Sequence, residues 1–259
     1  HIGLADVLLL NPTILDSLPL TLTPSQKVRV DADVKGHVDD LVIGKFGISA
    51  FSGTRLDASG KVKGLPDAEK LQLDLELDDF RTTRIDIENV LADTLLSDSV
   101  RLPEWLSLKA RYRGSPERGE FETTFTSSAG SAKANGKMDL DSASTTRGFS
   151  AILQVNDLNV GSILGKPDSV MGALTMHAEV NAKGLALEEL DGELKAAVDE
   201  FSFQNYKYQD LKVDGSIRNQ LATLTAVMED ENLNFDIDAK YLMTEEVPKY
   251  DFTFDLRNA

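Results

Sequence analysis

The chain of 259 residues contains no cysteine, which excludes disulfide bonds, cysteine-ligated zinc and a thiol nucleophile. Basic side chains are also scarce: 27 of them stand against 43 acidic ones, and the formal charge is -16. A field of this sign repels nucleic-acid phosphates and anionic membrane surfaces. We therefore expect neither nucleic-acid binding nor peripheral attachment to a membrane surface.

Long hydrophobic runs are lacking as well. The longest apolar stretches, such as 7–10 and 41–43, fall far short of the roughly 20 residues that a membrane-spanning helix needs. The sequence begins at His1 and ends at Ala259 within an alternating pattern, so we interpret it as an internal piece of a longer polypeptide. Any signal peptide or membrane anchor is then expected outside it.

Histidines, the usual carriers of acid–base catalysis, are few and scattered. His1 is terminal, His37 follows a turn glycine and His177 lies on the polar side of an expected strand, with no metal-binding spacing around them. The acidic cluster 229–231 lacks the loop spacing of an EF-hand and is interpreted as a solvated turn. The aromatic residues of 201–208 have acidic surroundings, which favours packing over base stacking. We expect no catalytic residue, no metal ligand and no cofactor, and an enzyme is the least expected class.

The sequence does have a period of two in hydrophobicity almost throughout. In the clearest run, 71–78, leucines alternate with glutamine and acidic residues. Successive side chains of a strand point to opposite faces, so this period predicts a sheet with one dry and one wet side. At least ten such runs occur, and together they predict an all-β fold.

Glycines end many of these runs, and one short sequence phrase is repeated among them. Many runs end at a glycine after a polar residue, which predicts tight reversals between strands. The glycine pairs are Lys35-Gly36, Lys63-Gly64, Arg113-Gly114, Asn135-Gly136, Lys183-Gly184 and Asp214-Gly215. Their spacing is irregular, so no fixed-period solenoid is predicted. A looser repetition links LELDDF at 75–80 with LQVNDL at 153–158.

Each copy of this phrase precedes a break in the alternation. The first break predicts a short helix at roughly 86–96, with Thr83 or Asp86 as its N-cap. The second predicts one or two helical turns at 160–164. The alternative at both places is an ordinary loop with a helical turn. A weak domain boundary is expected near 141–148, where Ser, Thr and Asp accumulate.

A sheet with one dry face must bury it against a second sheet, by closing into a barrel, or against a ligand. We expect an elongated, curled, antiparallel-rich sheet that forms a groove, because ten or more strands normally curl or split into layers. An apolar lining suits an alkyl chain, which offers about 0.8 kcal/mol per buried methylene. The residues predicted to line the groove are Leu71, Leu73, Leu75, Leu77, Leu108, Phe121, Phe125, Leu153, Val155, Leu194, Val198, Ile217, Phe235, Ile237, Phe252 and Phe254.

Several segments together carry a resemblance to a known family. They are LELDDFRTTRIDIENVL from Leu75, VRLPEWL from Val100, YRG at 112–114, NVGSIL from Asn159 and FQNYKYQDLKVDG from Phe203, with Gly184 between the last two. Together they resemble the TamB branch of the AsmA-like family of bridge-like lipid transport proteins, particularly its Bacteroidetes-type members. The resemblance covers most of the chain and consists of strand phrases, with no active-site signature.

The resemblance implies a large envelope protein of diderm bacteria that is anchored in the inner membrane by an N-terminal helix and crosses the periplasm. Its fold would be a β-taco whose apolar groove holds or conducts phospholipid acyl chains between the inner and outer membranes. The branch is also linked to outer-membrane protein assembly through a BamA-like barrel. The anchor and the C-terminal domain lie outside this sequence, so we expect membrane contact only through those parts.

Two other functions remain open at this point. One is a chaperone module that offers sheet edges to the strands of client outer-membrane proteins. The other is a closed β-sandwich of adhesive type, in which a second sheet would fill the dry interior. A one-residue β-bulge would invert the faces assigned here, so the lining residues also depend on the register of the strands.

Overall fold

The computed structural model describes residues 28–89, 100–141, 143–145, 147–184, 189–243 and 249–258. Within these residues, 14 strands form one unclosed antiparallel sheet, and their order in the sheet is their order in the chain. The all-β prediction is therefore confirmed, with short helices as the only helical structure among the described residues.

The chain divides into two compact units. The first comprises His1–Pro116, Glu122–Ala129 and Ile163–Gly165, and the second comprises Glu117–Phe121, Gly130–Ser162 and Lys166–Ala259. Strand β6 (Arg118–Ser127) has residues in both. The connection at 141–148, where a weak boundary was expected, lies inside the second unit between β7 and β8.

The first unit contains five further strands and two short helical segments. The strands are β1 (Val28–His37), β2 (Asp40–Ala50), β3 (Thr54–Lys63), β4 (Gln72–Thr83) and β5 (Trp105–Gly114). The 3-10 turn η1 (Ala68–Lys70) connects β3 to β4, and helix α2 (Arg84–Glu88) follows β4.

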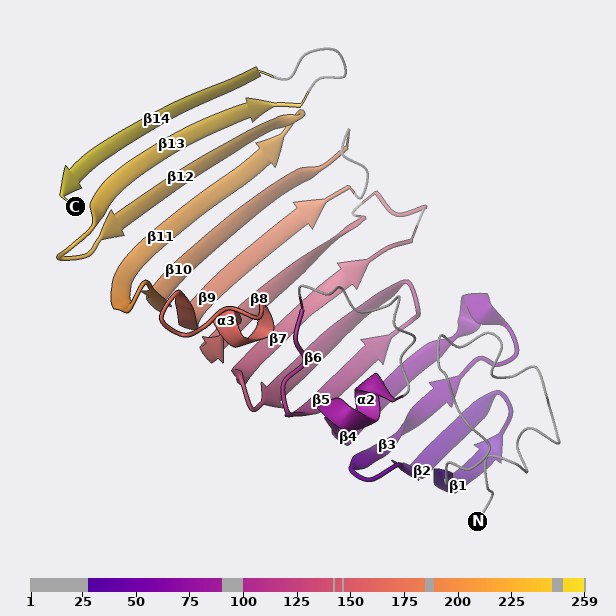
Figure 1. Cartoon of the computed structure of the whole chain (residues 1–259). Helices are drawn as coiled ribbons and strands as arrows, with labels where there is room; N and C mark the ends of the chain where they lie inside the picture. Colours follow the sequence, from indigo (N-terminus) through magenta and orange to yellow (C-terminus); the bar gives the residue numbers. More distant parts are fainter. Residues whose placement is uncertain are drawn as a thin grey trace. The chain divides into compact units, whose positions relative to one another are not determined.

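The second unit contains the remaining strands. They are β7 (Gly130–Asp139), β8 (Gly148–Asn159), β9 (Met171–Lys183), β10 (Asp191–Phe203), β11 (Tyr206–Arg218), β12 (Leu221–Glu229), β13 (Asn234–Leu242) and β14 (Lys249–Asn258). Helix α3 (Val160–Ile163) lies between β8 and β9. Figure 1 shows that these strands bend along their length, so the sheet of this unit is curled as predicted. No helix among the described residues is long and apolar enough to cross a bilayer.

Both breaks in the alternation are helical. Helix α2 begins at Arg84, two residues before the predicted start, and Thr83 is its N-cap, whose side chain accepts a hydrogen bond from the backbone N–H of Asp86 at 3.3 Å. The part of the predicted helix at 90–96 lies outside the described residues. Helix α3 confirms the helical turns predicted at 160–164.

The glycine pattern is only partly correct as a turn signal. Gly64 and Gly184 follow strand ends and have φ of +95° and +76°, as a tight reversal requires. Gly136 and Gly215, in contrast, lie in the interiors of β7 and β11. At Gly136 the reason is space, because an added Cβ would lie 2.2 Å from the Ser150 carbonyl oxygen and 2.9 Å from the Phe121 ring.

The repeated phrase LELDDF and LQVNDL marks a β-bulge. In β4 the cross-strand register to β5 shifts between Leu77 and Phe80, and in β8 the register to β9 shifts between Val155 and Leu158. A bulge inserts one extra residue into one strand of a pair. Because of this extra residue, Phe80 and Leu158 return to the apolar face, where strict alternation would have placed an aspartate.

Candidate functional site

The second unit presents four parallel rows of apolar residues on one face of its sheet. Residues directly opposite in an antiparallel pair lie on the same face, so the register of β7 to β14 defines each row. Every position is aliphatic, aromatic or glycine, and we name each row by its residue on β7. The Met138 row is Met138, Phe149, Ala182, Gly192, Ile217, Ala222, Tyr241 and Tyr250. The Gly136 row is Gly136, Ala151, Val180, Leu194, Gly215, Leu224, Ala239 and Phe252.

The other two rows complete this face. The Ala134 row is Ala134, Leu153, Ala178, Ala196, Val213, Ala226, Ile237 and Phe254, and the Ala132 row is Ala132, Val155, Met176, Val198, Leu211, Met228, Phe235 and Leu256. All predicted lining residues on β8 to β14 fall in these four rows. They are Leu153, Val155, Leu194, Val198, Ile217, Phe235, Ile237, Phe252 and Phe254.

The first unit has a shorter face of the same kind across β1 to β5. Its four rows are Val30, Ile48, Leu56, Phe80 and Leu108; Ala32, Phe46, Ala58, Leu77 and Ala110; Val34, Ile43, Gly60, Leu75 and Tyr112; and Gly36, Leu41, Val62, Leu73 and Gly114. The predicted residues Leu73, Leu75, Leu77 and Leu108 therefore share one face.

Three predicted lining residues lie outside these rows. Leu71 precedes β4 and is the C-cap residue of η1. Phe121 lies on β6 with its ring over Gly136, which places it on the apolar face of the second unit. Phe125 also lies on β6, where it is half-buried.

The alternation overlooked several residues of the apolar face. Phe80, Leu158 and Phe201 reach it through bulges, and their signal in the sequence is the three-residue spacing Leu77 to Phe80, Val155 to Leu158 and Val198 to Phe201. Strand β12 was overlooked entirely, because its other side is mixed: Leu221 and Val227 stand there beside Thr223, Thr225 and Glu229 and interrupt the alternation. Met228 on this strand is only 1% exposed.

Most of the apolar face remains accessible to solvent. Among the described residues only Ala129, Val155, Ala178, Ala226 and Met228 are buried apolar residues. Phe252 is 59% exposed, Phe254 49% and Leu194 39%. The described strands form one sheet, so a closed two-sheet sandwich is not the fold of this part of the chain.

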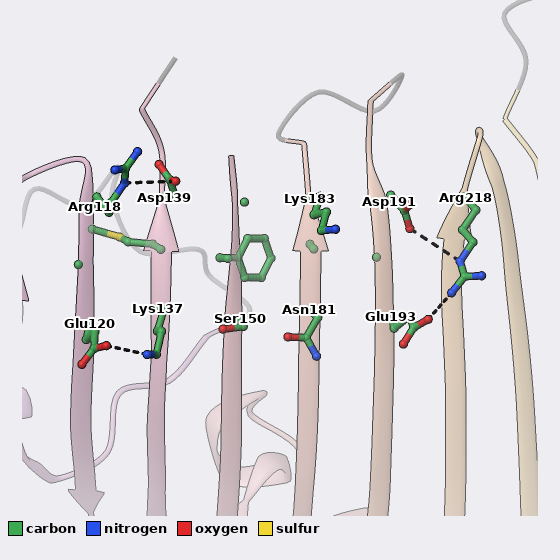
Figure 2. A pocket seen from close by; sticks show the side chains of 16 residues that line it. Arg118, Glu120, Lys137, Asp139, Ser150, Asn181, Lys183, Asp191, Glu193 and Arg218 are labelled. Atoms are coloured by element: carbon green, nitrogen blue, oxygen red, sulfur yellow. Dashed lines mark hydrogen bonds and ion pairs between the residues drawn. The ribbon is translucent and has the colours of Figure 1, made fainter. Parts of the chain in front are cut away.

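The opposite, polar face of the second unit contains a hollow of about 630 Å³. Figure 2 shows its side chains on neighbouring strands β6 to β11. Ser150 and Asn181 lie directly opposite each other across β8 and β9. Two ion pairs flank them: Lys137 Nζ lies 2.7 Å from Glu120 Oε1, and the Arg218 guanidinium pairs with Glu193.

A buried aspartate in each unit holds a turn by hydrogen bonds. Asp86 is 2% exposed and accepts hydrogen bonds from Ser52 Oγ at 2.8 Å, Gly53 N at 2.8 Å and Thr54 Oγ1 at 2.9 Å. Burial by itself raises the pKa of Asp86, but these hydrogen bonds outweigh burial and hold the pKa below its ordinary value. The turn between β2 and β3 is therefore tied to α2 by an ionised carboxylate.

In the second unit, Asp230 holds a turn by hydrogen bonds in the same way. It accepts hydrogen bonds from Tyr206 Oη at 3.1 Å, Gln209 N at 3.0 Å and Asn232 N at 2.8 Å. Burial opposes these bonds, yet the pKa of Asp230 is still lowered. Tyr206 packs edge-on against Tyr208 with 4.6 Å between ring centroids, so this part of the aromatic cluster serves packing, as expected.

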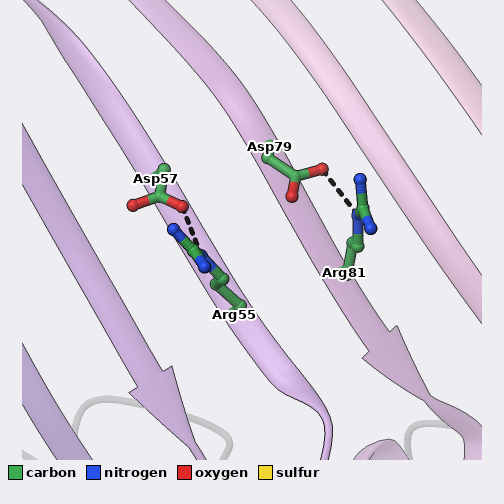
Figure 3. Close-up of polar contacts among 4 residues, drawn as sticks. All are labelled: Arg55, Asp57, Asp79 and Arg81. Atoms are coloured by element: carbon green, nitrogen blue, oxygen red, sulfur yellow. Dashed lines mark hydrogen bonds and ion pairs between the residues drawn. The ribbon is translucent and has the colours of Figure 1, made fainter.

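Two like-charged pairs face each other on the polar face of the first unit. Figure 3 shows Asp57 beside Asp79 and Arg55 beside Arg81. Like charges directly opposite destabilise a sheet. Here each arginine Nε bonds the aspartate of its own strand, at 2.5 Å for Asp57 and 3.0 Å for Asp79. The hydrogen bond from Arg55 lowers the pKa of Asp57.

The described residues contain no group of three or more His, Asp or Glu side chains placed to hold a metal ion. His37 and His177 are both exposed, and His177 Nδ1 lies 3.8 Å from Asp199 Oδ2. No protein-family model matches the chain, and comparison with curated proteins and with solved structures gave no match either.

Proposed function

We propose that the apolar face of this chain holds or conducts lipid acyl chains. The observation that carries the proposal is the four rows of the second unit, where every position across eight strands is aliphatic, aromatic or glycine, and all but four of these residues are half-buried or exposed. Large exposed apolar patches mark interaction sites on soluble proteins. The only hydrogen-bonding side chains in the four rows are Tyr241 and Tyr250 at the end of the Met138 row, and such a surface favours a partner that needs few hydrogen bonds.

Hydrocarbon chains meet this requirement. Each methylene that leaves water contributes about 0.8 kcal/mol, and a face of several rows can contact many methylenes of one chain. Strands lie about 4.8 Å apart, so eight of them extend the face over roughly 34 Å. The face is therefore long enough for an extended acyl chain.

On this basis, and on the resemblance to the TamB branch, we propose a biological setting. The chain would be a segment of a periplasmic bridge, anchored in the inner membrane by a part outside this sequence. It would conduct phospholipid acyl chains between the inner and outer membranes, and a BamA-like barrel in the outer membrane would be its partner.

A matched pair of variants tests acyl-chain binding. Leu153 belongs to the Ala134 row, and its neighbour Gln154 is exposed on the other face. We expect Leu153→Asp to weaken binding of a fluorescent fatty-acid probe about tenfold, whereas Gln154→Asp leaves binding unchanged. Circular dichroism should show that both variants are folded. If the two variants bind the probe with equal affinity, the apolar face is not the binding surface.

The natural ligand can be sought directly. Native mass spectrometry of protein purified from membranes is expected to show co-bound phospholipid. A ligand-free mass together with no binding of the fatty-acid probe would defeat the proposal.

A second candidate function is strand capture from unfolded outer-membrane proteins. The observation that favours it is β14, whose ten residues are all exposed and which pairs only with β13 among the described strands. An exposed edge strand is a template for β-augmentation. A photocrosslinker at Thr253 is expected to trap client protein under this function, and lipid or nothing under the first.

A further inference from the structure

The polar-face hollow of the second unit contains hydrogen-bonding groups that no described residue engages. Within the described part of the chain, Ser150, Asn181 and Lys183 make no side-chain hydrogen bond or ion pair with one another or with any other described residue. Asn181 and Lys183 are also exposed. A hydroxyl, an amide and an ammonium group thus lie close together on two adjacent strands, ready for a ligand.

Charges of both signs surround these free groups in equal number. The lining has four basic residues and four acidic ones: Arg118, Lys137, Lys183 and Arg218, with Glu120, Asp139, Asp191 and Glu193. The hollow is therefore locally neutral in a chain of formal charge -16. A ligand with net negative charge would meet the repulsive field of the whole chain, whereas a zwitterion would not.

The ion pairs around the hollow are weak enough to rearrange. Arg218 reaches Glu193 and also Asp191, whose Oδ1 lies 3.8 Å from the guanidinium Nε, and its side chain is 60% exposed. Exposed ion pairs contribute only about 0–1 kcal/mol. A ligand phosphate can therefore take over one of these cations at little cost.

The hollow adjoins the end of the apolar face. Lys183 and Gly148 form the last cross-strand pair of β8 and β9, and the next pair, Phe149 and Ala182, belongs to the Met138 row. The chain passes from β8 to β9 through α3 at the opposite ends of these strands. The β7–β8 and β9–β10 connections leave the sheet at the end beside Gly148, where the backbone N–H of Gly184 donates to the Arg147 carbonyl oxygen at 2.8 Å. An amphiphile on the apolar face would reach the hollow by folding its polar end around the strand ends between these two connections.

We propose that this hollow binds the zwitterionic head group of a lipid, meaning a phosphate ester that also carries an ammonium group. The inference rests on the proposed function, since it assigns the head-group site of the same ligand. The ammonium group of Lys183 attracts the phosphate by its charge, and the Asn181 amide and Ser150 hydroxyl donate hydrogen bonds to it. The carboxylates of Glu193 and Glu120 face the ammonium group.

Single-chain amphiphiles that differ only in their head group test the proposal. The probes are lysophosphatidylethanolamine, lysophosphatidic acid and monoacylglycerol with one common acyl chain, and free phosphoethanolamine. Each competes with a fluorescent fatty-acid probe for the full chain. We expect lysophosphatidylethanolamine to bind about tenfold more tightly than monoacylglycerol and more tightly than lysophosphatidic acid.

Two lysine variants provide the matched comparison. Lys195 on β10 is exposed, lies on the polar face opposite Glu179 and is not part of the hollow. Lys183→Gln is expected to weaken lysophosphatidylethanolamine binding about fivefold and to leave monoacylglycerol binding unchanged. Lys195→Gln removes the same charge and should change neither affinity.

The failures of the two proposals are distinguishable. Equal affinity of the wild-type chain for all three amphiphiles would overturn the head-group site and leave acyl-chain binding intact. Tighter binding of lysophosphatidic acid would also overturn it, in favour of a purely anionic site. Free phosphoethanolamine competing as well as the lysolipid would show a site for a soluble solute. If no amphiphile binds, the proposed function itself fails.

Discussion

The two units build similar apolar faces with different side-chain sizes. In the second unit, each strand from β7 to β13 has glycine or alanine at one or both positions of the two central rows, for example Ala196 on β10 and Gly215 on β11. In the first unit β1, β3 and β5 also have alanine or glycine in the central rows, but β2 has Phe46 and Ile43 and β4 has Leu77 and Leu75. The same hydrophobic period therefore places small residues on every strand from β7 to β13 but only on alternate strands of the first unit.

The buried residues differ as well. Among the described residues of the first unit, the buried polar residues Thr82, Asp86 and Ser127 outnumber the single buried apolar residue, Ala129. In the second unit Met228 is the most buried large side chain. A buried aspartate thus holds a turn in both units, and the second unit adds a buried apolar group, Val155, Ala178, Ala226 and Met228.

The largest expected effect is on packing in the second unit. Met228 lies opposite Leu211 and Phe235, and Met228→Ala should lower the free energy of unfolding of this unit by about 2–4 kcal/mol, because the methionine side chain leaves a cavity. Urea denaturation followed by circular dichroism measures the change. Phe252→Ala, at a residue already 59% exposed, should cost far less. Equal losses would show that packing around Met228 is not special.

The turn of the first unit is the next target. Asp86→Ala leaves the donors of Ser52, Gly53 and Thr54 without their acceptor, so the free energy of unfolding should fall by about 2 kcal/mol. Hydrogen exchange of the Gly53 amide should accelerate. Asp78→Ala, at an exposed carboxylate on β4, is the control and should leave that amide protected.

The buried carboxylates of Asp86 and Asp230 predict that the free energy of unfolding depends on pH. The pKa values of Asp86 and Asp230 are lower in the folded chain than in the unfolded chain. Their stabilisation is therefore complete above the unfolded pKa and is lost as pH falls through the folded values, which lie below about pH 4. Asp86→Asn should flatten the loss of stability of the first unit between pH 5 and about pH 2. An unchanged slope would contradict the lowered pKa.

A smaller effect is expected from two glycines in the second unit. Gly136→Ala should destabilise by about 1–2 kcal/mol because the new methyl group meets the Ser150 carbonyl oxygen and the Phe121 ring. At Gly215 the nearest atom would be 3.7 Å from an added Cβ, so Gly215→Ala should be neutral or slightly stabilising. Thermal unfolding of the two variants gives the comparison, and a stable Gly136→Ala protein would refute the close approach of Phe121.

The smallest expected effect is on the charges of the first unit. Arg55→Gln removes the hydrogen bond that lowers the pKa of Asp57 and leaves two aspartates opposite each other. The pKa of Asp57 should rise toward its ordinary value, which NMR titration of the carboxyl carbon measures. Lys61→Gln on the same strand should leave this pKa unchanged.

The sequence predicted local structure well where one side of a strand was clearly apolar. Leu75 and Leu77 share a face as expected, and Thr83 caps the helix that follows. Met228 could not be found in this way, because Leu221 and Val227 are apolar residues on the other side of β12 and only the neighbouring strands decide which side is covered. The hollow was not predicted either, since it joins residues from Arg118 to Arg218 on separate strands.

The amino-acid sequence alone determined the all-β class, since a period of two allows no other regular structure to separate polar from apolar side chains. The tertiary structure decided the register, and with it the bulges that return Phe80 and Leu158 to the apolar face. It also decided that the described strands form a single sheet. Alternation sets only the two sides of each strand, whereas the partner strands set which residues become neighbours.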